Sequence, residues 1–276
     1  MSWYPAPGKL NLFLHILGRR EEGEHAGYHE LQTVFRLIDR SDRVGVAASG
    51  DGRIVFDGPF GEDNLCVRAA RLLKMETGAR QGCDLTLEKS LPVGGGLGGG
   101  SSDAATVLLV LNRLWALNLP RGRLMQLALR LGADVPFFVF GRNALGEGLG
   151  ERLRPLDLPA AWYLVVTPQV SVSTKETFES ALTHRSKRIK IPRFFSGQGA
   201  NDLEPAVVAR YPEVAASLAW LRQHRPQARM TGSGACVFAE FETEAEARAL
   251  HSALPGGMKG FVARGLERHP LYDFTK

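Results

Sequence analysis

A run of seven residues, six of which are glycine, constrains this chain more than any other feature. The run is preceded by residues 84–89, whose apolar side chains alternate as in a strand, and followed by residues 104–115, which are apolar on almost every side as in a buried helix. Glycine adopts backbone angles that other residues resist and lets a ligand approach the main chain. A strand, a glycine loop and a helix N-terminus in this order predict a phosphate-binding loop, because unpaired N–H groups and the helix dipole both favour an anion.

The glycine run also partly fits a flexible linker and two other phosphate-binding motifs. The apolar flanks and the stiff Leu91-Pro92-Val93 that precedes the run favour the phosphate-binding loop over the linker. The run satisfies the dinucleotide pattern G-x-G-x-x-G, yet the acidic residue expected about 20 residues further on is missing. It also lacks the lysine of a Walker A loop, since Ser101 follows Gly100 directly. A cation for the phosphates must therefore come from elsewhere in the chain.

Composition bounds the class of protein. With 276 residues, 44% of them hydrophobic and 23% charged, the chain is long enough for two domains with their own cores. The net charge of +5 favours acidic ligands, among which nucleic acid is one candidate. The three cysteines are scattered, so no disulfide framework or metal cage is indicated. No signal peptide or apolar membrane span is recognisable, and we expect a soluble cytoplasmic protein without a membrane partner.

The hydrophobic pattern predicts a mixture of strands and helices. Strands are expected at 9–17, 28–35, 42–48, 53–56, 83–89, 162–167 and 260–264, and helices at 64–76, 102–115, 121–131 and 244–254. In the first strand, alternation would place Leu10, Leu12, Leu14 and Ile16 on one face, opposite the lysine and the asparagine. Residues 171–183 begin extended and turn helical, whereas 185–190 form a basic loop that is most simply a solvated segment. The prolines at 155–159 suggest a division into domains 1–155 and 156–276.

Three charged residues stand out in this pattern. Lys9 follows Pro-Gly at the mouth of the first strand, where it is either a solvated strand end or the cation that the glycine loop lacks. Asp134 lies between Gly-Ala and Val-Pro before a wholly apolar run, and it is either a capping aspartate or a functional carboxylate. Asp103 would repel a bound phosphate at the start of the helix, so we expect it to point away or toward a bound cation.

Three segments together resemble the motifs of the GHMP kinase superfamily. They are residues 5–11, residues 91–105 around the glycine run, and residues 231–236 with a second Gly-Ser turn. Gly8, where relatives often have alanine, and the segment 184–193, which does not align, depart from the pattern. The resemblance implies an α+β fold of two domains: a ribosomal-protein-like N-terminal domain that holds ATP and a ferredoxin-like C-terminal domain that holds the substrate.

The resemblance also implies an activity. A GHMP kinase transfers the γ-phosphoryl group of ATP, with Mg²⁺, to an alcohol. Residues 27–29, 62–65 and 131–136 match the branch whose substrate is a cytidine diphosphate-linked polyol of isoprenoid precursor biosynthesis. Two alternatives stay open: another small-molecule kinase of the homoserine or mevalonate class, and a non-enzymatic nucleic-acid binder suggested by the basic charge. We expect a monomer or weak homodimer that binds small molecules and no nucleic acid.

Site residues follow from matching the motifs. Lys9 and Asp134 are the implied catalytic residues, with Asp134 accepting the proton of the substrate hydroxyl; no metal ligand is assigned. The implied nucleotide-binding residues are Asn64, Lys89, Pro92, Gly94, Gly95, Gly96, Leu97, Gly98, Gly99, Gly100, Ser101 and Ser102. The implied substrate-binding residues are Asn11, Tyr28, His29, Thr174, Phe178, Gly232, Ser233 and Gly234. Among these, Tyr28 and Phe178 would sandwich the cytosine while His29 bonds its edge. The local sequence alone is equally consistent with Tyr28 as an aromatic residue at a strand edge and His29 as a surface histidine.

Overall fold

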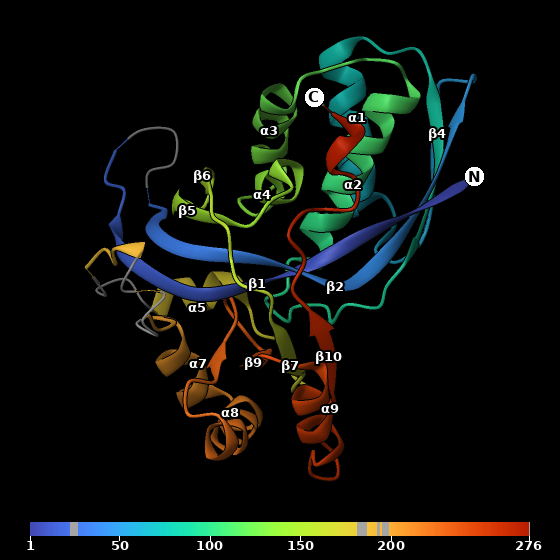
Figure 1. Ribbon diagram of the computed structural model, residues 1–276. Coiled ribbons are helices and arrows are strands. Elements are labelled where there is room, and N and C mark those ends of the chain that lie inside the picture. The colour runs from blue at the N-terminus through green and yellow to red at the C-terminus, as the bar shows by residue number, and fades with distance from the viewer. Residues whose placement is uncertain (23–26, 181–186, 192–193, 195–198, 276) are drawn as a thin grey trace.

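The chain forms four layers, with two β-sheets lying face to face between two groups of helices (Figure 1). The structure is a computed structural model that describes residues 1–22, 27–180, 187–191, 194 and 199–275. The layers confirm the mixed α+β class, because each sheet buries one face against helices and the other against the second sheet.

The first sheet is built around one very long strand. Its strands are β1 (Ser2–Arg19), β2 (His29–Ser49), β3 (Ile54–Asp57), β4 (Gly82–Glu88), β5 (Ala144–Gly148) and β6 (Arg152–Pro155). The order is β3-β4-β2-β5-β6, with β1 pairing with β2 from His29 to Val46. The expectation of two strands at 28–35 and 42–48 was wrong, because residues between them, polar ones included, pair with β1 and stay extended; Arg36, for example, pairs with Leu10.

Strand β1 is buried on both faces over residues 6–16, which overturns the simple alternation expected for it. Its register against β2 shifts at three places, one of them between Asn11 and Phe13, and such bulges re-aim the side chains that follow. Leu10, Leu12 and Phe13 therefore enter one core cluster while Leu14 and Ile16 enter another. Pro5 and Pro7 are tolerated because β1 pairs on one side only.

Four helices cover the outer face of the first sheet (Figure 1). They are α1 (Leu65–Thr77), α2 (Gly99–Leu114), α3 (Arg121–Leu129) and α4 (Val135–Phe140). Asn64 caps α1 as its sequence predicts, accepting the Cys66 N–H at 2.8 Å. Helix α2 is buried almost all round and begins at Gly99, three residues before the predicted start, so the last two glycines of the run form its first turn. The glycine loop is thereby anchored in the core.

The second sheet has the order β10-β7-β9-β8. Its strands are β7 (Trp162–Val166), β8 (Arg229–Met230), β9 (Val237–Phe241) and β10 (Gly260–Arg264). The helices that follow or cover it are α5 (Thr174–Ser180), α7 (Glu204–Arg210), α8 (Pro212–His224) and α9 (Glu244–Ser252). Short 3-10 turns lie at Gly61–Asp63, before α1, and at Tyr272–Phe274, near the C-terminus. The predicted strand at 260–264 is confirmed, and the predicted helix at 244–254 ends at Ser252.

The C-terminal segment returns to the helices of the first sheet, where the 3-10 turn at Tyr272–Phe274 lies against α2 (Figure 1). Leu266 N–H bonds the Leu37 carbonyl at 2.8 Å, and Arg121 Nη2 donates to the Thr275 carbonyl at 3.0 Å. The division into domains 1–155 and 156–276 stays a prediction; residues 156–161 do connect β6 of the first sheet to β7 of the second.

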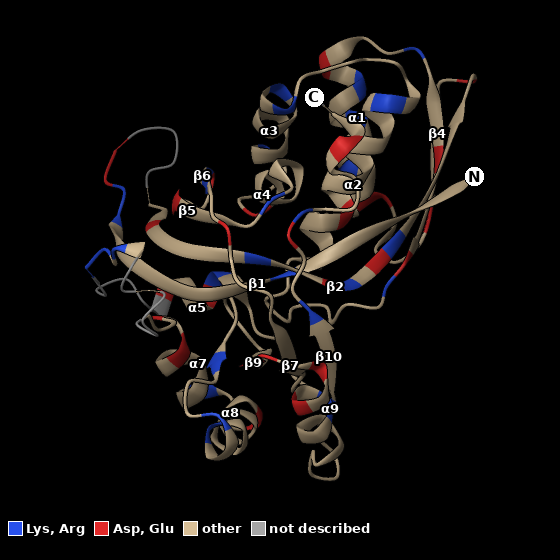
Figure 2. Ribbon diagram, viewed as in Figure 1, with Lys and Arg blue, Asp and Glu red and all other residues tan. Residues whose placement is uncertain are grey.

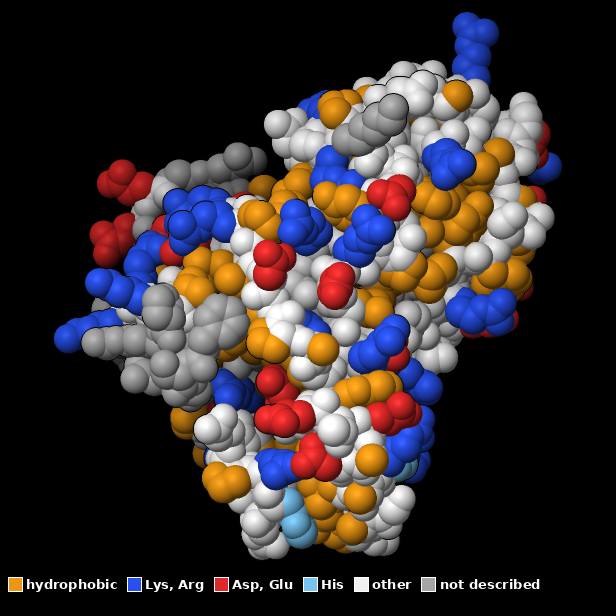
Figure 3. All heavy atoms as spheres, in the orientation of Figure 1, with side chains coloured by type: hydrophobic (Ala, Val, Ile, Leu, Met, Phe, Trp, Pro, Cys, Tyr) orange, Lys and Arg blue, Asp and Glu red, His pale blue; other side chains and the backbone are white. Residues whose placement is uncertain are grey.

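The basic loop predicted at 185–190 is only partly visible, since 185 and 186 lie outside the described residues. Within the described part, Arg188 Nη1 contacts Glu147 Oε1 at 2.5 Å. Lysine and arginine are spread over many elements in the ribbon, and in the space-filling view they alternate with acidic side chains on the face shown (Figures 2 and 3). This pattern does not favour the nucleic-acid alternative, which requires clustered basic residues. None of the described helices combines the length and apolar character of a membrane span.

Candidate active site

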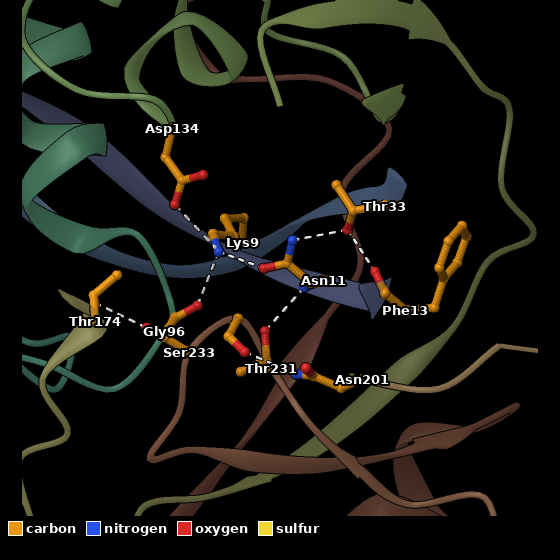
Figure 4. A network of polar contacts seen from close by, with 11 residues as sticks. Lys9, Asn11, Phe13, Thr33, Gly96, Asp134, Thr174, Asn201, Thr231 and Ser233 are labelled. Atoms are coloured by element: carbon orange, nitrogen blue, oxygen red, sulfur yellow. Dashed lines mark hydrogen bonds and ion pairs between the residues drawn. The ribbon is translucent and has the colours of Figure 1, made fainter. Parts of the chain in front are cut away.

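Lys9 is a buried cation, with 3% of its surface exposed, so the interpretation as a solvated strand end is wrong. Its ammonium lies at the centre of a polar network (Figure 4). Lys9 Nζ donates to Asn11 Oδ1 at 2.5 Å and to the Gly96 carbonyl at 3.0 Å. It also forms an ion pair with Asp134 Oδ2 at 3.3 Å. One side chain therefore connects the first strand, the glycine loop and the carboxylate before α4.

Asp134 directly precedes α4, whose residues 135–139 are buried. Its side chain makes no capping hydrogen bond to the helix, so the capping interpretation is wrong. The carboxylate turns toward Lys9 instead and keeps 36% of its side-chain surface exposed (Figure 4). A carboxylate that is fixed by a buried ammonium and still open to the cavity can accept a proton from a bound ligand.

The glycine loop is packed and ordered by contacts, which excludes the flexible-linker interpretation. Gly94, Gly96 and Gly98 have φ of +68°, +75° and +70°, values that side chains rarely adopt. A Cβ on Gly96 would lie 2.2 Å from the Thr231 carbonyl oxygen, so only glycine fits there. Gly98 ends the loop as the N-cap of α2 and offers no side chain to the first turn. The N–H groups of that turn are left to bind an anion.

The second Gly-Ser turn braces the loop from the other sheet. The Ala235 and Cys236 N–H groups donate to the Gly94 and Gly95 carbonyls at 3.2 and 3.1 Å. Asn201 Nδ2 in turn holds the turn through the Gly232 carbonyl at 2.7 Å. Asn11 completes the link, because its N–H donates to Thr231 Oγ1 at 2.9 Å (Figure 4). Asn201 and Thr231 were not among the predicted site residues. Thr231 begins the motif at residues 231–236, whereas nothing in the local sequence marks Asn201.

The loop, Lys9 and Asp134 line one open cavity of about 540 Å³. The predicted residues that line it are Lys9, Asn11, Asn64, Lys89, Pro92, Gly94, Gly95, Gly96, Leu97, Gly98, Gly99, Gly100, Ser101, Asp134, Thr174, Phe178, Gly232 and Ser233. Ser102, Gly234, Tyr28 and His29 are not part of its lining. Ser102 is fully buried behind the loop, and Gly234 packs on Met230. Phe60 and Asp63, which also line the cavity and lie close to Asn64 in the sequence, were not among the predicted site residues.

One of the three predicted base-binding residues is part of the cavity lining. Phe178 lines the cavity, and the His29 ring lies 5.6 Å from it, centroid to centroid, with a tilt of 37°. Burial, and secondarily the charge of Arg19, lower the pKa of His29, so its neutral form is favoured. His29 Nε2 is buried without a partner among the described residues, whereas Tyr28 is 58% exposed. Thr174 Oγ1 and Ser233 Oγ lie 2.9 Å apart and join α5 to the second Gly-Ser turn.

Asp103 is part of the cavity lining rather than turned away from it, and its carboxylate contacts a cation of the chain itself, not a bound one. That cation is Lys89, whose Nζ lies 2.8 Å from Asp103 Oδ2 and 2.5 Å from Asp42 Oδ2. Lys89 lines the cavity but is held by two buried carboxylates. One of them, Asp42, was not among the predicted site residues. The parts of the chain that the structure describes contain no cluster of three or more His, Cys, Asp or Glu able to hold a metal ion.

Known proteins resemble this chain over nearly its whole length. Residues 64–142 match the family described as GHMP kinases N terminal domain, and residues 181–260 match GHMP kinases C terminal. The 4-diphosphocytidyl-2-C-methyl-D-erythritol kinase of Thiobacillus denitrificans is 59% identical over 99% of this chain and 98% of its own length. That of Nitrosospira multiformis is 58% identical over 99% of this chain and 94% of its own length.

Solved structures extend the comparison. A crystal structure of 4-(cytidine 5'-diphospho)-2C-methyl-D-erythritol kinase superposes with a TM-score of 0.84 at 35% identity, covering 96% of this chain and 99% of the other. Homoserine kinase from Cytophaga hutchinsonii superposes with a TM-score of 0.69 at 17% identity over 97% of this chain and 94% of the other. At that identity the second likeness shows the fold alone.

Proposed function

The chain belongs to the GHMP kinases, and among them to the 4-diphosphocytidyl-2-C-methyl-D-erythritol kinases, and we propose on this basis that it phosphorylates the 2-hydroxyl of 4-diphosphocytidyl-2-C-methyl-D-erythritol with ATP. Its activity is that of a phosphotransferase with an alcohol acceptor, in the non-mevalonate route to isoprenoid precursors. The observation that carries the assignment of roles is the Lys9 ammonium, which contacts both the glycine loop at 3.0 Å and Asp134 at 3.3 Å.

Phosphoryl transfer depends on positioning and charge neutralisation more than on covalent chemistry. In the proposed mechanism the glycine loop and the first turn of α2 hold the triphosphate by N–H groups, and Lys9 supplies the positive charge that the loop lacks. The substrate hydroxyl lies beside Asp134, which accepts its proton as the oxygen bonds to the γ-phosphorus. The bond from that phosphorus to the β–γ bridging oxygen breaks, and ADP leaves.

Asn11 and the second Gly-Ser turn serve to keep this arrangement rigid. Asn11 receives a hydrogen bond from Lys9 and donates through Nδ2 to Thr33 Oγ1 at 2.8 Å, so the ammonium has a fixed position (Figure 4). Mg²⁺ would neutralise charge on the phosphates and would take most of its ligands from phosphate oxygens and water, as this ion commonly does. The three free cysteines, all buried, support the prediction of a cytoplasmic location.

A phosphorylation assay across candidate alcohols tests the proposed substrate. We expect turnover with 4-diphosphocytidyl-2-C-methyl-D-erythritol and ATP, and none above background with homoserine or mevalonate, because only the first carries a base for the His29–Phe178 end of the cavity. Formation of ADP coupled to phosphorylated product is the measurement. Comparable rates with homoserine or mevalonate would contradict the proposal and favour the other kinase classes.

Replacement of His29 by alanine tests the proposed base-binding end. The change removes the ring that lies 5.6 Å from Phe178 and the unpaired Nε2. Since His29 is the proposed partner of the base edge, and loss of a hydrogen-bond partner costs about 1–3 kcal/mol, the KM for the alcohol substrate should rise roughly 5- to 150-fold. The KM for ATP should stay within about twofold.

His224→Ala is a matched control, because this histidine ends α8 and does not line the cavity. It should leave both KM values unchanged. If His29→Ala raised the two KM values equally, His29 would not belong to the base-binding end.

A further inference from the structure

Three charged side chains meet behind the glycine loop, each from a different element. Asp42 lies on β2, Lys89 directly follows β4, and Asp103 is in the first turns of α2. Lys89 Nζ lies 2.5 Å from Asp42 Oδ2 and 2.8 Å from Asp103 Oδ2. The two carboxylates are buried, with 0% and 2% of their side-chain surface exposed. With every group ionised the cluster carries one excess negative charge, close to where the phosphates of a nucleotide would lie.

The two carboxylates are not equivalent. Asp42 Oδ1 accepts hydrogen bonds from the N–H groups of Ser90 and Leu91 at 2.6 and 2.8 Å. Its Oδ2 accepts one from Lys89, so both oxygens have the partners that a buried carboxylate anion requires. Asp103 Oδ1 is buried and has no hydrogen-bond partner within the described ranges. An unsatisfied oxygen of a buried anion is costly, whereas a protonated carboxyl carries no charge to solvate. Asp103 is therefore the member of the pair that can hold a proton.

The surroundings of Asp103 support this assignment. Burial raises the pKa of Asp103 to about 7; the Lys89 ammonium acts in the opposite direction and Asp42 in the same direction. The other titratable group nearby is Cys66 on α1, and burial raises the pKa of this thiol, so it stays neutral. The first-turn N–H groups of α2 favour an anion, but the phosphates of a bound nucleotide would compete for the same groups.

We propose that Asp103 is a positioning residue that takes up a proton when nucleotide phosphates enter the glycine loop. The proton removes the excess negative charge behind the loop and leaves Lys89 with Asp42 as its single anionic partner. An ammonium has three N–H donors, and the carboxylates use two, so the third is available to a phosphate oxygen. Lys89 lines the cavity, which places it within reach of such a ligand. The inference rests on the proposed function in one respect, that ATP occupies the loop.

Titration calorimetry tests the proposal with MgATP, without the alcohol substrate, at pH 7.5. Repeating the titration in buffers of different ionisation enthalpy gives the number of protons exchanged. We expect the wild-type protein to take up about half a proton or more in excess of Asp103→Asn, because added phosphate charge raises the pKa of a nearby carboxyl. The difference between the two proteins cancels any protonation of the nucleotide itself.

Glu88→Gln is the matched control, since it removes an exposed carboxylate one residue from Lys89 that pairs with Arg43 at the surface. Its proton uptake should equal that of the wild type. Equal uptake by wild type and Asp103→Asn would overturn the inference while leaving ATP binding intact. Absence of any ATP binding to the wild type would instead overturn the proposed function, and the inference with it.

A second measurement requires only the wild-type protein. Infrared difference spectra at pH 8 should show the C=O stretch of a newly protonated carboxyl when MgATP is added. The dissociation constant for MgATP should also increase about fivefold between pH 7 and pH 8, because proton uptake is then part of binding. An unchanged carboxyl region together with a pH-independent dissociation constant would overturn the inference even if Asp103→Asn did not fold.

Discussion

Replacement of Asp134 by asparagine is expected to lower kcat by about 10²- to 10⁴-fold, the usual range for loss of a general base. The amide keeps the shape of the side chain but cannot accept the proton of the substrate hydroxyl. Because Asp134 is half-buried and lies outside the loop that holds the phosphates, the KM values for ATP and for the alcohol should stay within about tenfold. Steady-state kinetics with both substrates, varied independently, measure the effect.

The design of this experiment has to separate chemistry from folding. Asp134 makes no capping bond to α4, so its replacement removes one ion pair to Lys9 and no backbone contact. The melting temperature should therefore change little. Asp157→Asn is a suitable control, because this carboxylate is fully exposed and contacts Arg142 at the surface. A fully active Asp134→Asn protein would rule out the role of Asp134 as the base.

The part of the site that sequence predicts best is the part whose chemistry is local. A glycine run between a strand and an apolar helix predicts phosphate binding through its backbone angles and free N–H groups, both properties of neighbouring residues. The structure places Gly94 to Gly100 on the cavity with three positive φ angles. Asn64 likewise caps the helix that its sequence context predicts.

The part that sequence does not predict depends on contacts between distant segments. Lys9 is buried because the strand that carries it is covered on both faces, and local alternation cannot show this. Asp42 and Lys89 are 47 residues apart, and no local pattern pairs them. The same is true of Asn201, which holds the Gly232 carbonyl 31 residues away. Such residues become visible only when both sheets are assembled.

These distant contacts explain why the two sheets act as one site. The glycine loop belongs to the first sheet and its helices, whereas the turn that carries Thr231 belongs to the second. The main chains of the loop and the turn are joined by hydrogen bonds at Gly94 and Gly95. The phosphate-binding geometry is consequently set by an interface between two halves of the chain and should be sensitive to a single added methyl group there.

Gly96→Ala provides that test, and we expect it to lower kcat/KM for ATP by about 10²-fold or more, since a displacement of about 1 Å in a positioning element has this effect. The new Cβ would lie 2.2 Å from the Thr231 carbonyl oxygen and 3.1 Å from that of Gly234, both of them backbone atoms with little freedom to move. The φ of +75° at this residue adds strain for any side chain. The Gly96 carbonyl, which accepts from Lys9 at 3.0 Å, would move with the loop.

The same substitution should destabilise the fold by about 1–3 kcal/mol, the range for overpacking a closely packed site. Gly122→Ala is the matched control, because it lies in α3, its added Cβ meets nothing within 4 Å, and alanine there should stabilise the protein by about 0.5–1 kcal/mol. Denaturant unfolding and ATP-dependent kinetics of both variants measure the two effects. A Gly96→Ala protein with wild-type stability and wild-type kcat/KM for ATP would show that the glycine loop does not rest on the turn at Thr231, and that the two sheets do not share the nucleotide site.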